Sequence, residues 1–152
     1  MALNGNSFAA KLHELEDEYR LLRLRIQQAQ RLDSAQLRQA LTSVLADCRK
    51  TSQSLARSVK EGRSPAVAAL SGVQLDYMKR MEELLQKELP KDLHVKNHTA
   101  AIDHAEAAAL YAEYAMDFAT LSMRQALAAA LAALLQAAEN QETNEKGATQ
   151  YE

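Results

Sequence analysis

Apolar side chains recur along this chain at alternating spacings of three and four residues, and this period restricts its fold more than any other feature. The stretch NSFAAKLHELEDEYRLLRLRIQQAQ, residues 6–30, keeps the period throughout. Its apolar seam consists of Phe8, Leu12, Leu15, Tyr19, Leu22, Ile26 and Ala29. Such a seam is typical of a helix that packs lengthwise on another helix.

A second segment repeats the same period between clear start and stop signals. Asp33, followed by Gln36 three residues later, resembles a capping box and predicts a helix start. The seam of this segment consists of Leu37, Leu41, Val44, Cys48, Thr51 and Leu55. Gly62 follows Lys60 and Glu61 and is expected to end the helix as its C′ residue.

The third segment begins at the clearest boundary of the chain, GRSPAV. Ser64 is a good N-cap residue, and Pro65 suits the first helical position because that position needs no N–H donor. Gly72 lies inside the helix, where glycine costs about 1 kcal/mol relative to alanine, so it predicts a close helix crossing. Pro90 is expected to end the helix.

The fourth segment is rich in alanine, with 17 alanines among residues 100–138. Alanine is the best helix former, so a long helix over 99–140 is expected. After Glu139 the sequence becomes polar and predicts a disordered tail over 141–152. Few glycines, prolines and aromatic residues argue against a sheet.

These four segments predict an all-α fold, an antiparallel up-and-down four-helix bundle with an extended Ala-rich fourth helix. The expected helices cover 7–31, 34–61, 65–89 and 99–140, within a single domain over 1–140. Short connections make the first three helices sequential neighbours. The fourth helix is too long to match the others, so an arrangement in which two chains exchange this helix is the alternative architecture.

The run ALAAALAALLQAA, residues 126–138, is the most unusual stretch of the chain. A membrane span is disfavoured because Arg124 and Gln125 lie in the required window and alanine contributes little to insertion. Helix propensity alone would leave several leucines in water. Close contact with another helix explains both residue types, since leucines supply bulk and alanines allow close approach. The expected contact residues are Leu127, Ala128, Leu131, Ala132, Leu134 and Leu135, and self-association is the favoured form.

Three histidines form the one cluster that points to chemistry. His94 and His98 are four residues apart, and His104 follows, with Asp92, Asp103 and Glu106 nearby. Such ligands suit Zn, Ni or Cu. However, Pro90 disfavours a regular helix through this region, so histidines that cap and solvate a loop are the simpler interpretation. A metal- or ligand-binding bundle that uses His94, His98 and His104 is therefore the alternative function.

Other catalytic classes find little support in the sequence. Glu-x-x-His, which a ferritin-like di-metal centre would need, does not occur. Cys48 lies on the second seam and is interpreted as a buried structural thiol rather than a nucleophile. No phosphate-binding loop, nucleophile elbow or Cys-x-x-Cys is present. We therefore predict no catalytic, cofactor-binding or metal residues, no cofactor and no enzymatic activity.

Charge and cysteine content bear on partner and compartment. The net charge is −2, with an excess of basic residues over 31–63 and of acidic residues over 103–152. The basic side chains do not form one stripe and have no interleaved aromatic residues, so nucleic-acid binding is not expected. A single cysteine and an N-terminus without signal-peptide character predict a cytoplasmic protein. The predicted function is a non-enzymatic helical protein that acts through helix–helix contact.

Overall fold

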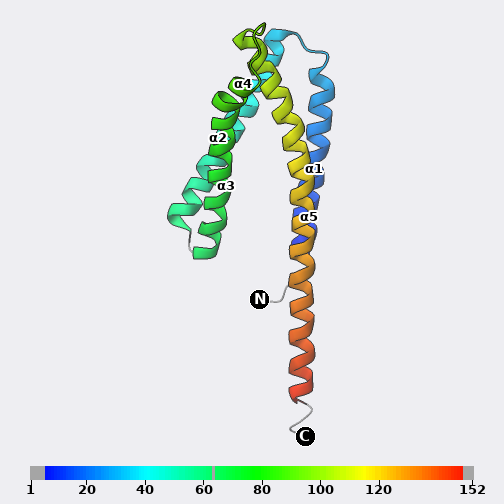
Figure 1. The fold of residues 1–152 in the computed structure, drawn as a ribbon. Coiled ribbons are helices and arrows are strands. Elements are labelled where there is room, and N and C mark those ends of the chain that lie inside the picture. Colours follow the sequence, from blue (N-terminus) through cyan, green and yellow to red (C-terminus); the bar gives the residue numbers. More distant parts are fainter. Residues whose placement is uncertain (1–5, 63, 149–152) are drawn as a thin grey trace. The chain divides into compact units, whose positions relative to one another are not determined.

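The computed structural model describes residues 6–62 and 64–148, and over these residues the chain forms helices without any strand (Figure 1). The four long helices are α1 (Asn6–Ala29), α2 (Ser34–Glu61), α3 (Pro65–Glu83) and α5 (Ala100–Ala148). A π-helical turn, η1 (Leu84–Glu88), and a short helix, α4 (Leu89–Asp92), continue α3. The prediction of an all-α fold is confirmed. The packing of all four helices in one antiparallel bundle stays a prediction.

The chain divides into two compact units. One unit contains residues 31–114, and the other combines α1 with α5 from Ala115 onward. Helix α5 is a single uninterrupted helix that belongs to both units, and it continues to Ala148, beyond the predicted end at residue 140. The assignment of residues 1–140 to one domain and 141–152 to a disordered tail stays a prediction, and residues 149–152 lie outside the described part of the chain.

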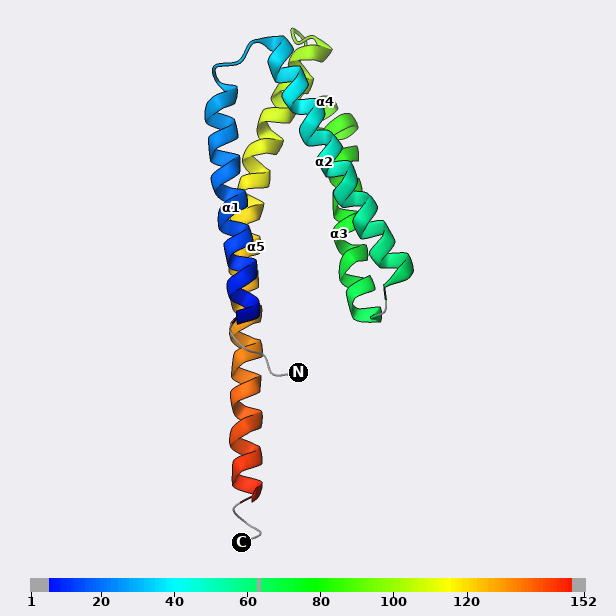
Figure 2. The same ribbon diagram turned by 180° about the vertical axis from the view of Figure 1, so that it is seen from behind.

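Within the unit of residues 31–114, α2 and α3 form a helical hairpin (Figure 2). Small side chains line the contact. Ser71 on α3 is buried, and Ser52 on α2 approaches Met78 on α3, with 3.8 Å between Oγ and Sδ. A Cβ built on Gly72 would lie 3.9 Å from Cγ2 of Val59 on α2. Gly72 therefore lies at the contact between the two helices, where the sequence predicted a crossing.

The predicted helix starts are present. The Asp33 side chain accepts a hydrogen bond from the backbone N–H of Gln36 at 2.8 Å, and the Gln36 side chain accepts one from the N–H of Asp33 at 3.1 Å. This reciprocal pair satisfies two N–H groups that have no partner within the helix. Ser64 occupies the N-cap of α3, but its hydroxyl makes no capping bond, and Pro65 follows in the first turn.

Gly62 ends α2 for a different reason from the one expected. A C′ glycine usually adopts left-handed backbone angles, whereas Gly62 has φ −61° and ψ 127°, which other residues adopt readily. Lack of space explains why a glycine occupies position 62, because a Cβ there would overlap the backbone carbonyl oxygen of Ser58. Gly62 is thus required by close approach of the backbone rather than by its conformation.

The prediction that Pro90 ends the third helix is wrong, because the helical path continues through Pro90 to Asp92. The backbone N–H of Leu89 donates to the carbonyl of Leu84, five residues earlier, which is the π-helical pattern. Proline has no N–H and its ring collides with the preceding turn of an ordinary α-helix. A wider turn directly before Pro90 relieves that collision, so the chain keeps its helical path.

The predicted seams are not buried. Among the described residues, the buried side chains are Ala107, Pro90, Ser71 and Asp103. Seam residues such as Leu12 and Leu41 are 63% and 58% exposed. Cys48 is also exposed, so its interpretation as a buried thiol is wrong. The period placed these residues correctly on one face of each helix, but a helical period cannot show whether another helix covers that face.

Candidate functional site

The distal part of α5 exposes a continuous face of leucine and alanine. Leu127, Leu131 and Leu135 are 60%, 57% and 59% exposed, and they follow one another at intervals of four residues. We call the predicted contact residues the distal face, which consists of Leu127, Ala128, Leu131, Ala132, Leu134 and Leu135. All six are exposed. Apolar side chains that gather on one exposed surface commonly mark an interaction site.

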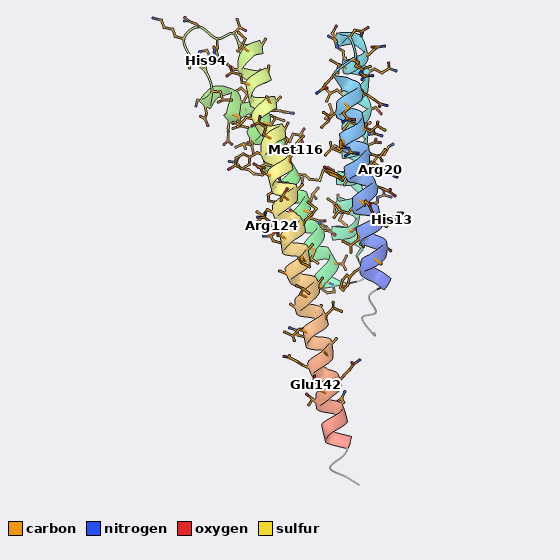
Figure 3. All side chains as sticks on the ribbon, turned by 90° about the vertical axis from the view of Figure 1, so that its right-hand side faces the viewer. His13, Arg20, His94, Met116, Arg124 and Glu142 are labelled. Atoms are coloured by element: carbon orange, nitrogen blue, oxygen red, sulfur yellow. The ribbon has the colours of Figure 1, made fainter. Side chains whose placement is uncertain are left out.

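Helix α1 leaves this part of α5 uncovered. Figures 1 and 2 show that the orange and red part of α5 extends beyond the first turn of α1, drawn in dark blue. Figure 3 shows side chains standing out along this part of the helix, where Arg124 and Glu142 are labelled. The seam of α1 therefore does not shield the distal face, although both belong to the same unit.

Helix α5 is also long and apolar enough, by length and composition, to cross a membrane. Its candidate span lies within Ala100–Asn144 and reaches a mean hydropathy of 1.5. One such helix is weak evidence for a membrane protein. Arg124 and several polar residues lie in the apolar part, and alanine gains little from insertion.

A second cluster lies where the connection after α4 meets the start of α5. Asp103, in the first turn of α5, is only 4% exposed. Its Oδ2 lies 2.7 Å from Nδ1 of His94, and its Oδ1 lies 3.1 Å from Nδ1 of His98. Glu106 is a weaker neighbour, with its Oε2 at 3.7 Å from Nδ1 of His98. One buried carboxylate therefore holds two imidazoles from the preceding connection.

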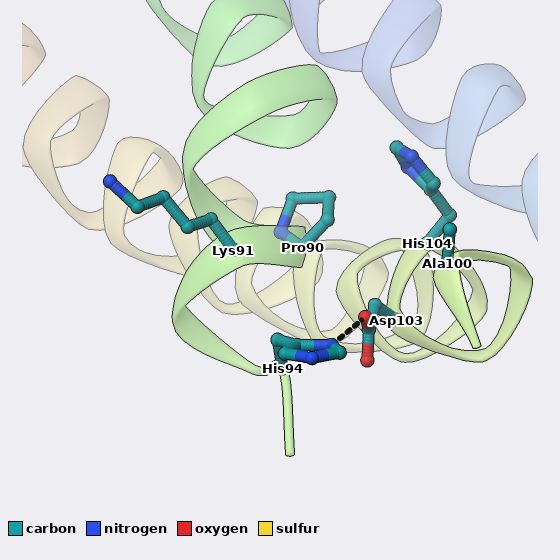
Figure 4. Close-up of a pocket in the computed structure, with 6 residues that line it drawn as sticks. All are labelled: Pro90, Lys91, His94, Ala100, Asp103 and His104. Atoms are coloured by element: carbon teal, nitrogen blue, oxygen red, sulfur yellow. Dashed lines mark hydrogen bonds and ion pairs between the residues drawn. The ribbon is translucent and has the colours of Figure 1, made fainter. Parts of the chain in front are cut away.

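The third predicted histidine does not join this cluster. Figure 4 shows His104 pointing away from Asp103 and His94, as expected for the next residue along a helix, which is turned by about 100°. No group of three or more His, Cys, Asp or Glu residues that could hold a metal ion occurs in the described ranges. The structure thus brings together His94 and His98 without His104.

Hydrogen bonding lowers the pKa of Asp103. The bond from His94 is the largest cause, and the bond from His98 acts in the same direction, while loss of water around the carboxylate opposes both. The neighbouring hollow of about 320 Å³ is lined by Pro90, Lys91, His94, Ala100, Asp103 and His104 (Figure 4). Because both oxygens of Asp103 already have partners, the cluster is suited to fix the connection to the start of α5.

The sequence analysis did not predict the role of Asp103 and treated it only as one of several acidic residues near the three histidines. Its position offers a usable signal. Asp103 follows Thr99 by four residues, and Thr99 Oγ1 accepts from the N–H of Ile102 at 3.4 Å, so Asp103 lies in the first helical turn. The helix dipole favours an acidic side chain in the first turn, and His94 and His98 lie just upstream as candidate partners.

Comparison with known proteins adds no family to these observations. No protein-family model matches the chain, and neither a curated protein nor a solved structure matches it. The functional argument therefore depends on the geometry of α5 and of the Asp103 cluster.

Proposed function

We propose that this is a non-enzymatic interaction protein that acts through helix–helix contact, with the distal face of α5 as its contact surface. The observation that carries this proposal is the exposure of Leu127, Leu131 and Leu135, each more than half accessible to water. Covering the rest of a leucine of this kind is worth roughly 1–2 kcal/mol. Covering several of them supplies part of the free energy that offsets the loss of translational and rotational freedom on association.

The alanines of the distal face specify what kind of surface fits it. Ala128 and Ala132 lie between leucines and leave shallow positions that a bulky side chain of another helix can enter. A flat charged surface would not use this relief, and neither would a nucleic acid. The expected partner is thus another helix. The expected compartment is the cytoplasm, where a single exposed thiol such as that of Cys48 stays reduced.

The test is to place charge on the distal face while keeping the helix. In the Ala128→Glu/Ala132→Glu variant, helix propensity falls by only a few tenths of a kcal/mol per site. We expect sedimentation to give a dimer or larger species for the wild type and a monomer for the variant. Circular dichroism should show unchanged helicity in both.

The matched control is Ala126→Glu/Ala130→Glu, which has the same spacing and charge on the roughly opposite side of α5. It should assemble like the wild type. Equal loss of assembly in both variants would contradict the proposal, and so would flotation of the wild-type monomer with phosphatidylcholine vesicles. Unfolding of the Ala128→Glu/Ala132→Glu variant would also contradict it, because the face would then belong to the core of the monomer.

A further inference from the structure

We infer that the distal face of α5 pairs antiparallel with the same face of a second copy, centred midway between Leu131 and Ala132. This inference rests on the proposed association function and names both the partner and the register. Ala128, Leu131, Ala132 and Leu135 lie within about 50° of one line along the helix, at about 100° per residue. Arg124 and Glu139 lie on the same line at its two ends.

The apolar residues complement one another in this register. Ala128 of one chain faces Leu135 of the partner subunit, and the reverse contact repeats on the other side of the two-fold axis. Leu131 and Ala132 both lie next to the two-fold axis, on opposite sides of the helix–helix contact. Leu131 therefore packs against Leu131 of the partner subunit, and Ala132 packs against Ala132 of the partner subunit. Two leucine–alanine contacts therefore flank the centre, and small residues lie where bulk from the partner must fit.

The charged residues at the two ends of this line of residues, Arg124 and Glu139, agree with the same register. Arg124 of one chain faces Glu139 of the partner subunit, and Glu142 follows about one turn further along the helix. Within one helix Arg124 and Glu139 are about 22 Å apart, so they cannot pair with each other. Neither side chain makes an ion pair with any other residue in the described part of the chain. In a parallel pair the like charges would face each other instead.

Charge exchange tests this register through the dissociation constant of the dimer, measured by sedimentation. Arg124→Glu alone and Glu139→Arg alone each place two like-charge contacts across the axis, so each should raise the Kd at least tenfold. The combined Arg124→Glu/Glu139→Arg variant restores opposite charges and should return the Kd to within fivefold of the wild type. The effect of each single exchange should shrink in 1 M NaCl.

The Ala126→Glu/Ala130→Glu control changes the net charge as much as Arg124→Glu does, on the other side of the helix. Its Kd should match the wild type. A dimer that Ala128→Glu/Ala132→Glu disrupts, but that neither single exchange weakens, would overturn the antiparallel register and leave the proposed function standing. If the wild type is monomeric at high concentration, the partner is not a second copy of this chain and the inference is wrong. The proposed function would then require a helix of a different protein as the partner.

Disulfide trapping tests the orientation independently. With Cys48→Ser as background, Ala132→Cys places two thiols beside the two-fold axis, within the range that a disulfide can bridge. Ala128→Cys places its two copies about 10 Å apart along the helix axes, too far to bridge. We expect mild oxidation to cross-link the first variant and not the second. Cross-linking of both would show a parallel pair and overturn the inference.

Discussion

At the scale of single residues, Asp103 is the one buried charged side chain in the described part of the chain. It is buried, both of its oxygens have imidazole partners, and those partners come from the connection that precedes α5. A buried carboxylate without partners would be costly, so the two histidines make its position possible. The chain therefore uses two of its three clustered histidines to anchor a helix start.

Asp103→Asn is expected to lower the thermal midpoint near neutral pH, because an amide cannot accept bonds from both imidazoles as a carboxylate does. The folded-state pKa of Asp103 is lowered, so its stabilisation is complete above its ordinary pKa of about 3.9 and is lost as the pH falls through the lowered value. Calorimetry between pH 2 and 7 should show the two midpoints converging below about pH 4.

Asp92→Asn is the matched control, since Asp92 is exposed and makes no hydrogen bond or ion pair that involves its side chain among the described residues. Its midpoint should follow the wild type at every pH. A constant gap between wild type and Asp103→Asn down to pH 2 would contradict the assigned role of the Asp103 carboxylate.

At the scale of elements, the α2–α3 hairpin contains two glycines, of which only one is sterically required. Gly72 lies within α3, and a side-chain methyl would only reach ordinary contact with Val59. Gly62 lies after α2, where the same methyl would overlap the backbone of Ser58. The first glycine therefore weakens its helix without a steric need, and the second is sterically required.

Gly72→Ala should raise the free energy of unfolding by up to about 1 kcal/mol, because alanine is the better helix former and the space exists. Gly62→Ala should lower it, because the backbone of the turn must move. Urea denaturation followed by circular dichroism compares the two directly. Destabilisation by Gly72→Ala would mean that the hairpin contact is tighter than the structure shows.

The elements also show what the sequence could predict. Local signals located the helix starts at Asp33 and Pro65, because capping chemistry acts within a few residues. The π turn before Pro90 escaped prediction, since a proline more often stops a helix than widens the turn before it. The exposure of Cys48 escaped as well, because burial depends on which distant helix covers a face. For the same reason the sequence could list three histidines but not select the two that meet Asp103.

At the scale of the whole molecule, the chain has more apolar helix faces than its own packing covers. Seam residues on α1, α2 and α5 are exposed together. The exposed part of a leucine side chain contributes nothing to folding until something covers it. Under the proposed function, part of the stability of this protein comes from its partner, and stability and assembly are then linked.

The thermal midpoint should therefore depend on protein concentration. If a second copy covers the distal face, dissociation accompanies unfolding, and each tenfold increase in concentration should raise the midpoint by about 2 °C. Differential scanning calorimetry over a hundredfold range measures this. Ala128→Glu/Ala132→Glu should have a concentration-independent midpoint, whereas the same slope in both proteins would place the association elsewhere.

The π turn has a consequence for how this chain will compare with relatives. A π turn holds one residue more than the α turn it replaces. A homologue with a regular helix at this point should be one residue shorter between Leu84 and Glu88. It should also be free to carry a residue other than proline at position 90. An alignment that spreads this difference into substitutions would misplace every residue between the π turn and α5.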